Sequence, residues 1–190
     1  MFRKSDIVNF DLVLPLFSGG MNPSQVAGIK RILRACDGLP ITYQAYLLAT
    51  SFHETAQAMQ PIYEVGPRQY FSKYEPGTRL GRALGNTTPG DGYLYRGRGD
   101  VMLTGRSGYA KAGAALDIDL VGNPDQALNP AISARILVLG CCKGWFTGRK
   151  LGDYLESDPP DYTQARRVVN GIDRASLIAG YAARFEEALS

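Results

Sequence analysis

Histidine is almost absent from this chain, since His53 is the only one among its 190 residues. A helical zinc site needs a second histidine four residues further along, and that position holds Gln57. The sequence therefore excludes a histidine-based metal site, and we expect neither a metal nor another cofactor. Any reaction that requires an imidazole must use His53.

Cysteine is also scarce, with only Cys36, Cys141 and Cys142. An odd number with two adjacent residues is not the spacing of a disulfide framework. We expect reduced, buried side chains in a protein made in a cytoplasm. A nucleophilic site that joins Cys36 or Ser51 to His53 is a formal alternative.

Long hydrophobic runs are missing as well. The first six residues include Arg3, Lys4 and Asp6, and the apolar residues that follow are interrupted by Asn9 and Asp11. Neither a signal-peptide core nor a membrane-spanning length is present. We therefore expect cytoplasmic synthesis without a signal peptide, no stable membrane association, and a separate protein for release if the chain acts outside.

The composition is that of an ordinary globular protein, with 45% apolar and 21% charged residues. We expect one domain over residues 1–190. The net charge of +3 suits an anionic partner such as a cell-wall polymer. No basic run alternates with aromatic residues, so we expect no nucleic acid partner.

Capping residues and apolar periodicity predict a mainly helical fold. The middle of the chain, about residues 60–105, is instead rich in glycine, proline and tyrosine, which predicts an irregular insertion with a short hairpin over residues 93–104. Its tyrosines suit a groove wall that stacks on sugar rings. The expected helices run from Asn22-Pro23 to Gly38, from Thr42 to about Ala58, from Asn129-Pro130 past Leu139, from Asp161 to Val169, and from Leu177 to Leu189.

The pair His53-Glu54 ends the apolar run of residues 45–49. A carboxylate there is costly unless it is neutralised, paired or used, and burial raises a carboxyl pKa toward that of a proton donor at neutral pH. With Glu64 or Glu75 it would form the carboxylate pair that glycosidic bond cleavage requires. The alternatives are a salt-bridged structural carboxylate at Glu54 and a packed imidazole at His53.

Several segments, taken in order, resemble glycoside hydrolase family 19, which contains class I chitinases and many phage endolysins. The first two are specific motifs, and together the segments span about residues 45–185. The resembling segments are residues 47–55 (LLATSFHET), 95–109 (YRGRGDVMLTGRSGY), 116–124 (LDIDLVGNP) and 169–171 (VNG).

The resemblance implies a lysozyme-like, two-lobed helical domain with a substrate groove lined by the insertion. It implies that Glu54 is the general acid and that Thr104 holds the attacking water. Glu64 is the preferred second carboxylate and Glu75 the reserve. The expected substrate-binding residues are His53, Tyr63, Tyr95, Arg98, Tyr109 and Asn170, where Tyr95, Arg98 and Tyr109 either line the groove or brace it.

The chain departs from the plant pattern at three points. Residues 100–102 replace the usual Pro-Ile-Gln, Ile172 replaces a second glycine after Asn170, and the disulfides of plant members are absent. We therefore expect an antimicrobial bacteriophage endolysin, a monomer that cuts bacterial peptidoglycan during host cell lysis. It would act in the periplasm or cell wall after release through a holin-type pore. The alternatives are a chitinase, an inert wall-binding module of the same fold, and a peptidase that uses Cys36 and His53.

Overall fold

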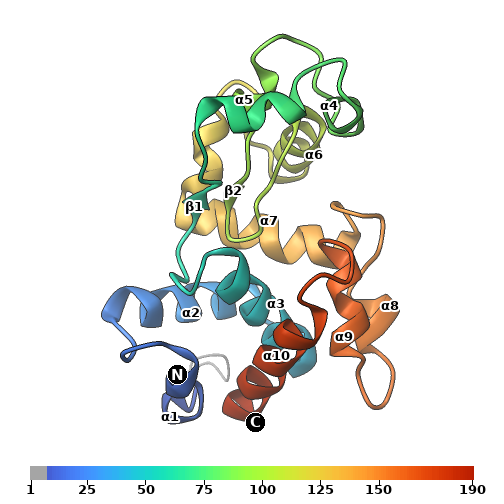
Figure 1. Ribbon diagram of the computed structural model, residues 1–190. Helices are drawn as coiled ribbons and strands as arrows, with labels where there is room; N and C mark the ends of the chain where they lie inside the picture. Colours follow the sequence, from blue (N-terminus) through green and yellow to red (C-terminus); the bar gives the residue numbers. More distant parts are fainter. Residues whose placement is uncertain (1–7) are drawn as a thin grey trace. The chain divides into compact units, whose positions relative to one another are not determined.

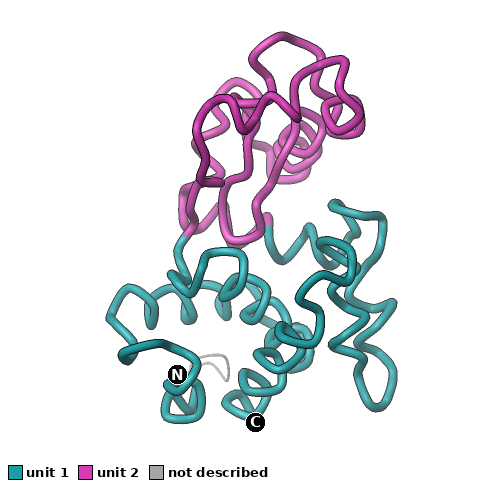
Figure 2. The backbone as a smooth tube through the Cα atoms, in the orientation of Figure 1, with its two compact units in different colours: residues 1–60, 137–190 teal, residues 61–136 magenta. Residues whose placement is uncertain are grey.

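The computed structural model describes residues 8–190, and the chain divides into two compact units (Figure 2). Unit 1 contains residues 1–60 and 137–190, and unit 2 contains residues 61–136. Residues 1–6, on which the expectation about targeting partly rests, lie outside the described residues. Over the described part of the chain, no helix has the length and apolar character needed to cross a membrane.

The described chain is mainly helical with one two-stranded sheet, which confirms the predicted fold class (Figure 1). Unit 1 contains α1 (Phe10–Val13), η2 (Leu14–Leu16), α2 (Pro23–Ala35), α3 (Ile41–Glu54), α8 (Gly152–Leu155), α9 (Tyr162–Ala165), η5 (Arg166–Val168) and α10 (Ala175–Leu189). Unit 2 contains β1 (Ile62–Tyr63), η3 (Arg68–Tyr74), α4 (Arg79–Ala83), α5 (Asp91–Leu94), β2 (Arg98–Gly99), α6 (Arg106–Leu116) and η4 (Pro124–Leu128). Helix α7 (Pro130–Lys143) begins in unit 2 and ends in unit 1.

Side-chain caps start three of the helices at the predicted places. The Asn22 side chain accepts a hydrogen bond from the backbone of Gln25, whose own side chain accepts one from the Asn22 backbone. Asn129 accepts from two backbone N–H groups at the start of α7, and Asp161 caps α9. The prediction that Thr42 caps the next helix is wrong, because α3 begins at Ile41, directly after Pro40.

The core of unit 1 is built around Phe52 on α3. Its ring packs edge-on against Phe17, Tyr181 and Phe185, with centroid separations of 5.0, 4.8 and 6.1 Å. Helices α3 and α10 lie against each other in this unit. Because Phe52 immediately precedes His53-Glu54, this packing fixes the backbone position of the pair.

Helix α3 ends at Glu54, four residues before the predicted end near Ala58. The helix ends in a Schellman motif, in which the Gln57 N–H donates to the Phe52 carbonyl at 2.8 Å and the Ala56 N–H to the His53 carbonyl at 3.2 Å. Ala56 and Gln57 then take left-handed backbone conformations with φ of 48° and 71°. Glu54 is therefore the last helical residue rather than an interior one.

Unit 2 contains the predicted irregular insertion, whose helical pieces are all short. Strand β1 pairs antiparallel with β2 in the register Ile62 to Gly99 and Tyr63 to Arg98. Arg98 also forms a bridge with Leu103, so part of the hairpin expected over residues 93–104 is present. Its first two residues instead end the helical turn α5.

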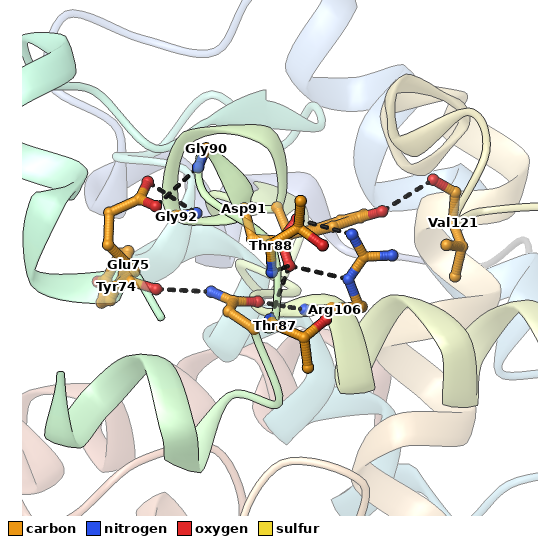
Figure 3. A network of polar contacts seen from close by, with 11 residues as sticks. Tyr74, Glu75, Thr87, Thr88, Gly90, Asp91, Gly92, Arg106 and Val121 are labelled. Carbon is orange, nitrogen blue, oxygen red and sulfur yellow. Dashed lines mark hydrogen bonds and ion pairs between the residues drawn. The ribbon is translucent and has the colours of Figure 1, made fainter. Parts of the chain in front are cut away.

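A polar network holds the loops of the insertion together (Figure 3). The buried carboxylate of Asp91 accepts two hydrogen bonds from the Arg106 guanidinium, at 2.7 and 2.9 Å. It also accepts the backbone N–H groups of Thr87 and Thr88. The Asn86 amide group donates to the Tyr74 carbonyl and accepts the Arg106 backbone N–H, with both hydrogen bonds at 2.8 Å. These contacts replace the hydrogen bonds that longer helices would have supplied.

Unit 2 is expected to lose stability in acid through Asp91. Hydrogen bonds from Arg106 lower the pKa of this carboxyl from 3.8 to about 2. The stabilisation is present above pH 4 or so, and it is lost as the pH falls toward 2. Asp91→Asn should reduce the free energy of unfolding at pH 7 by about 2–4 kcal/mol and flatten its decline below pH 4. Urea unfolding of both proteins across pH 2.5–7 measures this, and an unchanged acid decline in the variant would contradict the assignment.

Candidate active site

Glu54 is held by an arginine that the sequence interpretation missed. The Arg166 Nη1 donates to Glu54 Oε1 at 2.6 Å, and their side chains are 4% and 16% exposed. The Arg166 Nε also donates to the Asp173 carbonyl, which fixes the guanidinium. A carboxylate at the end of a buried helix is therefore paired, as its burial requires. The available signal was Arg166-Arg167 inside the short helical segment that Asp161 caps.

His53 lies half-buried beside this pair. Burial lowers the pKa of its imidazole, Glu54 opposes that effect, and Arg166 and Arg174 reinforce it. His53 is therefore neutral at pH 7, with one ring nitrogen able to donate and the other able to accept. Asn170 is exposed one turn after Arg166, and its backbone N–H donates to the Arg166 carbonyl at 3.0 Å.

Glu64 lies in unit 2, at the end of β1. Its Oε2 accepts the Gly97 N–H at 3.0 Å, and its Oε1 accepts the Tyr74 hydroxyl at 3.1 Å. Its backbone N–H donates to the Gly97 carbonyl at 2.8 Å. The carboxylate is thus fixed in direction but only half-buried. Tyr74 is one of the tyrosines that the sequence suggests for a groove wall, and its hydrogen bond to Glu64 is a role that the sequence does not indicate.

Glu75 is bound to the loops of its own unit. Its Oε2 accepts the Gly90 N–H at 2.7 Å and its Oε1 accepts the Gly92 N–H at 3.2 Å (Figure 3). Both oxygens therefore stabilise the backbone around α5, whereas one oxygen of Glu64 meets only a side-chain hydroxyl. This difference favours Glu64 over Glu75 as a carboxylate available for chemistry.

Thr104 and the altered residues 100–102 lie on one turn of unit 2. The Thr104 hydroxyl donates to the Met102 carbonyl at 2.8 Å, so the lone pairs of its oxygen can accept a hydrogen bond from water. Asp100 is fully buried and accepts the Ser133 hydroxyl at 2.5 Å. Asp100, the first of the three residues that depart from the plant pattern, thus connects this turn to α7.

Tyr95, Arg98 and Tyr109 are all buried, at 2%, 3% and 0% exposure. Arg98 donates to Asp125 and to the Tyr109 hydroxyl, at 2.8 and 2.9 Å. Of the two predicted roles, lining or bracing the groove, this burial favours bracing. Tyr63 differs from these three, because it is 37% exposed and lies beneath the Arg96 guanidinium.

The geometry disfavours a thiol nucleophile. Burial, together with the nearby Cys142, raises the pKa of the Cys36 thiol to about 12, so the reactive thiolate does not form near neutral pH. Ser51 is also fully buried. Within residues 8–190, no group of three or more histidine, cysteine or acidic side chains could hold a metal ion.

Comparison with known proteins gives both structural and sequence similarity. Chitinase C from Streptomyces griseus HUT6037 superposes with a TM-score of 0.66 at 19% identity, over 95% of this chain and 90% of that one. A bacterial family 19 chitinase superposes with a TM-score of 0.61 at 20% identity, over 95% and 92%. Chitinase 8 of Oryza sativa subsp. japonica is 55% identical over 38 residues, which cover 20% of this chain and 15% of the rice enzyme.

No family model matches the chain. The structural matches nevertheless extend over nearly its whole length and include a chitinase of the family that its motifs resemble. The chain has the fold of the family 19 chitinases, and the predicted resemblance is confirmed at the level of the fold.

Proposed function

We propose that this chain is a glycoside hydrolase that cuts glycosidic bonds of bacterial peptidoglycan, as an endolysin does. One observation carries the proposal. In a chain with the fold of family 19 chitinases, Glu54 and Glu64 are each held in a fixed direction while remaining partly accessible. Two such carboxylates are the groups that direct hydrolysis of a glycosidic bond needs. Neither is missing, which disfavours an inert wall-binding module.

Glu54 acts as the general acid in the proposed reaction. Its protonated form gives a proton to the glycosidic oxygen as the bond to the anomeric carbon breaks, so the departing sugar leaves as a neutral alcohol. Arg166 positions the carboxyl group through Oε1, which leaves Oε2 to carry the proton toward the substrate. His53, which is neutral, and Asn170 supply hydrogen bonds to the sugars.

Glu64 acts as the general base on a water molecule. The Thr104 hydroxyl donates a hydrogen bond to the Met102 carbonyl, so its oxygen is free to accept a hydrogen bond from this water. The second O–H group of the water then points toward Glu64. The water oxygen then attacks the anomeric carbon while Glu64 takes the proton. Attack from the face opposite the departing oxygen inverts the configuration, and Glu64 and Glu54 exchange protons through solvent before the next cycle.

Arg166 is expected to control how well Glu54 is oriented. Arg166→Gln should lower kcat by about 10- to 100-fold with a smaller change in KM, because the carboxyl group is no longer held in the reactive direction. Arg166→Lys, which keeps the positive charge but not the planar guanidinium group, should recover part of the lost kcat. Steady-state kinetics with circular dichroism as a folding control measure this. A wild-type kcat in the glutamine variant would show that the ion pair does not position the acid.

Peptidoglycan is preferred to chitin as the proposed substrate because of the altered positions. Met102 replaces a glutamine that contacts sugar in the resembling family, and Ile172 is 60% exposed where a glycine is usual. Chitin is the second candidate. The rice protein that matches a short segment of this chain is a chitinase, and so are the proteins whose structures superpose on it.

The proposed biological setting is lysis of a phage host. The protein would work as a monomer on the glycan strands of the wall, without nucleic acid or a stable membrane attachment. It would reach the wall from the cytoplasm through a holin-type pore.

Turbidity of permeabilised Gram-negative cells tests the proposal. The wild-type protein should clear the suspension and release reducing sugars, and it should act on chitin oligomers far more slowly. Fast release from chitin with unchanged turbidity would favour the second candidate. Clearing without new reducing sugars would reject a glycosidase.

A further inference from the structure

Unit 2 carries a group of aromatic and cationic side chains that contacts Glu64 through Tyr74. The Arg96 guanidinium lies between two rings, 4.5 Å from the Tyr63 centroid and 4.2 Å from the Tyr93 centroid. The Arg68 guanidinium lies 5.1 Å from the same Tyr93 ring. The Lys73 ammonium lies over Tyr70 and Tyr74, at 3.4 and 4.7 Å. Tyr74 also donates to Glu64, so these contacts extend to the candidate base.

Within the described part of the chain, this cationic cluster, defined as Arg68, Lys73 and Arg96, has no acidic partner. Across residues 8–190, the three side chains form no ion pair, whereas Arg98, Arg106 and Arg166 each pair with a carboxylate. The Arg96 Nη1 donates to the Tyr93 carbonyl, which fixes the plane of the guanidinium without neutralising it. Since no ion pair of the described residues neutralises these three cations, they contribute positive charge to this surface.

The cluster is also accessible to a ligand. Arg68 is exposed, Lys73 and Arg96 are half-buried, and the exposed fractions of Tyr63 and Tyr70 are 37% and 44%. An arginine that lies over two rings and donates to a backbone carbonyl is restrained before binding, so it loses little entropy when it meets a planar carboxylate. Rings for sugar faces and fixed cations for carboxylates are therefore combined on one surface.

We propose that the cationic cluster binds carboxylates on the substituents of the glycan and makes the chain selective for an anionic glycan over a neutral one. This inference rests on the proposed function and names the substrate feature that unit 2 recognises. Rings alone would serve an uncharged polymer such as chitin. An arginine without an acidic partner binds a carboxylate more strongly than a neutral acceptor, so these cations favour a ligand that carries negative charge. Arg96 directly precedes Gly97 in the chain, and Tyr63 directly precedes Glu64. A carboxylate bound at Arg96 therefore also fixes the sugar near the proposed base.

Two carboxylates of peptidoglycan have this chemistry. One is carried by the stem peptides, and the other is the lactyl carboxylate that an amidase exposes when it removes the stem. Three preparations separate them: intact glycan, amidase-stripped glycan, and either preparation with its carboxylates converted to neutral amides by carbodiimide and ammonia.

The test measures binding of the Glu54→Gln variant, which holds the glycan without cutting it. On this background, Arg68→Gln with Arg96→Gln removes two cations of the cluster. Arg149→Gln with Lys150→Gln removes the same charge from exposed positions of unit 1 and is the matched control. Pelleting with insoluble glycan at 50 and 200 mM salt gives the affinities.

The parent variant should bind charged glycan at least tenfold more tightly than amidated glycan at 50 mM salt, and this ratio should shrink at 200 mM. The cluster variant should bring the ratio close to one, while the control keeps it. If only intact glycan shows the preference, the stem peptide is the ligand, and if stripped glycan shows it too, the lactyl group suffices. Equal affinity of the parent for charged and amidated glycan would overturn the inference. That outcome differs from failure of the proposed function, which would appear as wild-type protein releasing no reducing sugar from any preparation.

Discussion

Replacing Glu54 by glutamine is expected to reduce glycosidic hydrolysis by about 10³-fold or more. The amide keeps the shape of the side chain and can still accept a hydrogen bond from Arg166, but it cannot deliver a proton to the departing oxygen. The glycosidic bond then has to break with an alkoxide as its leaving group. Turbidity loss and reducing-sugar release should both cease, whereas pelleting with the glycan should be retained.

The matched control for this variant is Glu187→Gln. Glu187 lies on α10 of the same unit, is 53% exposed and pairs with Arg184. It should lyse cells at the wild-type rate, which separates loss of the acid from loss of one negative charge. Near-wild-type lysis by Glu54→Gln would exclude Glu54 as the proton donor.

Replacing Glu64 by glutamine is expected to cost about 10²–10⁴-fold in kcat, because water then attacks without a base. The amide can still accept the N–H of Gly97, so unit 2 should keep its fold. Glu75→Gln is the informative comparison, since both oxygens of Glu75 bind backbone. Glu75→Gln should lower the free energy of unfolding. It should reduce kcat less than Glu64→Gln does.

The stereochemistry gives a second readout of the role of Glu64. An inverting enzyme has its two carboxyl groups about 6.5–9.5 Å apart, against about 5 Å in a retaining enzyme. Proton NMR of a β-linked substrate should therefore show the α-anomer first.

A Glu75→Gln variant that loses as much kcat as expected for Glu64→Gln, with intact folding, would exchange the two assignments.

The main features of the fold could be predicted from local chemistry. Asn22, Asn129 and Asp161 cap helices where their side chains satisfy backbone N–H groups, and this signal is contained within four residues of sequence. The early end of α3 could not be predicted in the same way. It depends on left-handed backbone conformations at Ala56 and Gln57, and neither is the glycine that usually signals such an end.

The candidate site shows the same division. Glu54 was conspicuous because a carboxylate ended an apolar run, yet its partner Arg166 is 112 positions away and no local pattern connects them. Tyr95, Arg98 and Tyr109 were predicted from motif position, and only the packed structure shows that they are buried. A sequence identifies candidate residues by their type and their position in a motif, whereas long-range pairing and burial are properties of the tertiary fold.

Mass spectrometry of purified peptidoglycan digested by the wild-type protein tests the central claim most directly. Glycosidic hydrolysis adds one water across a sugar–sugar bond, so we predict fragments with a new reducing end, and the identity of that sugar names the bond. The Glu54→Gln variant should produce none of them. New free amines without new reducing ends would identify a peptidase or amidase and contradict the account.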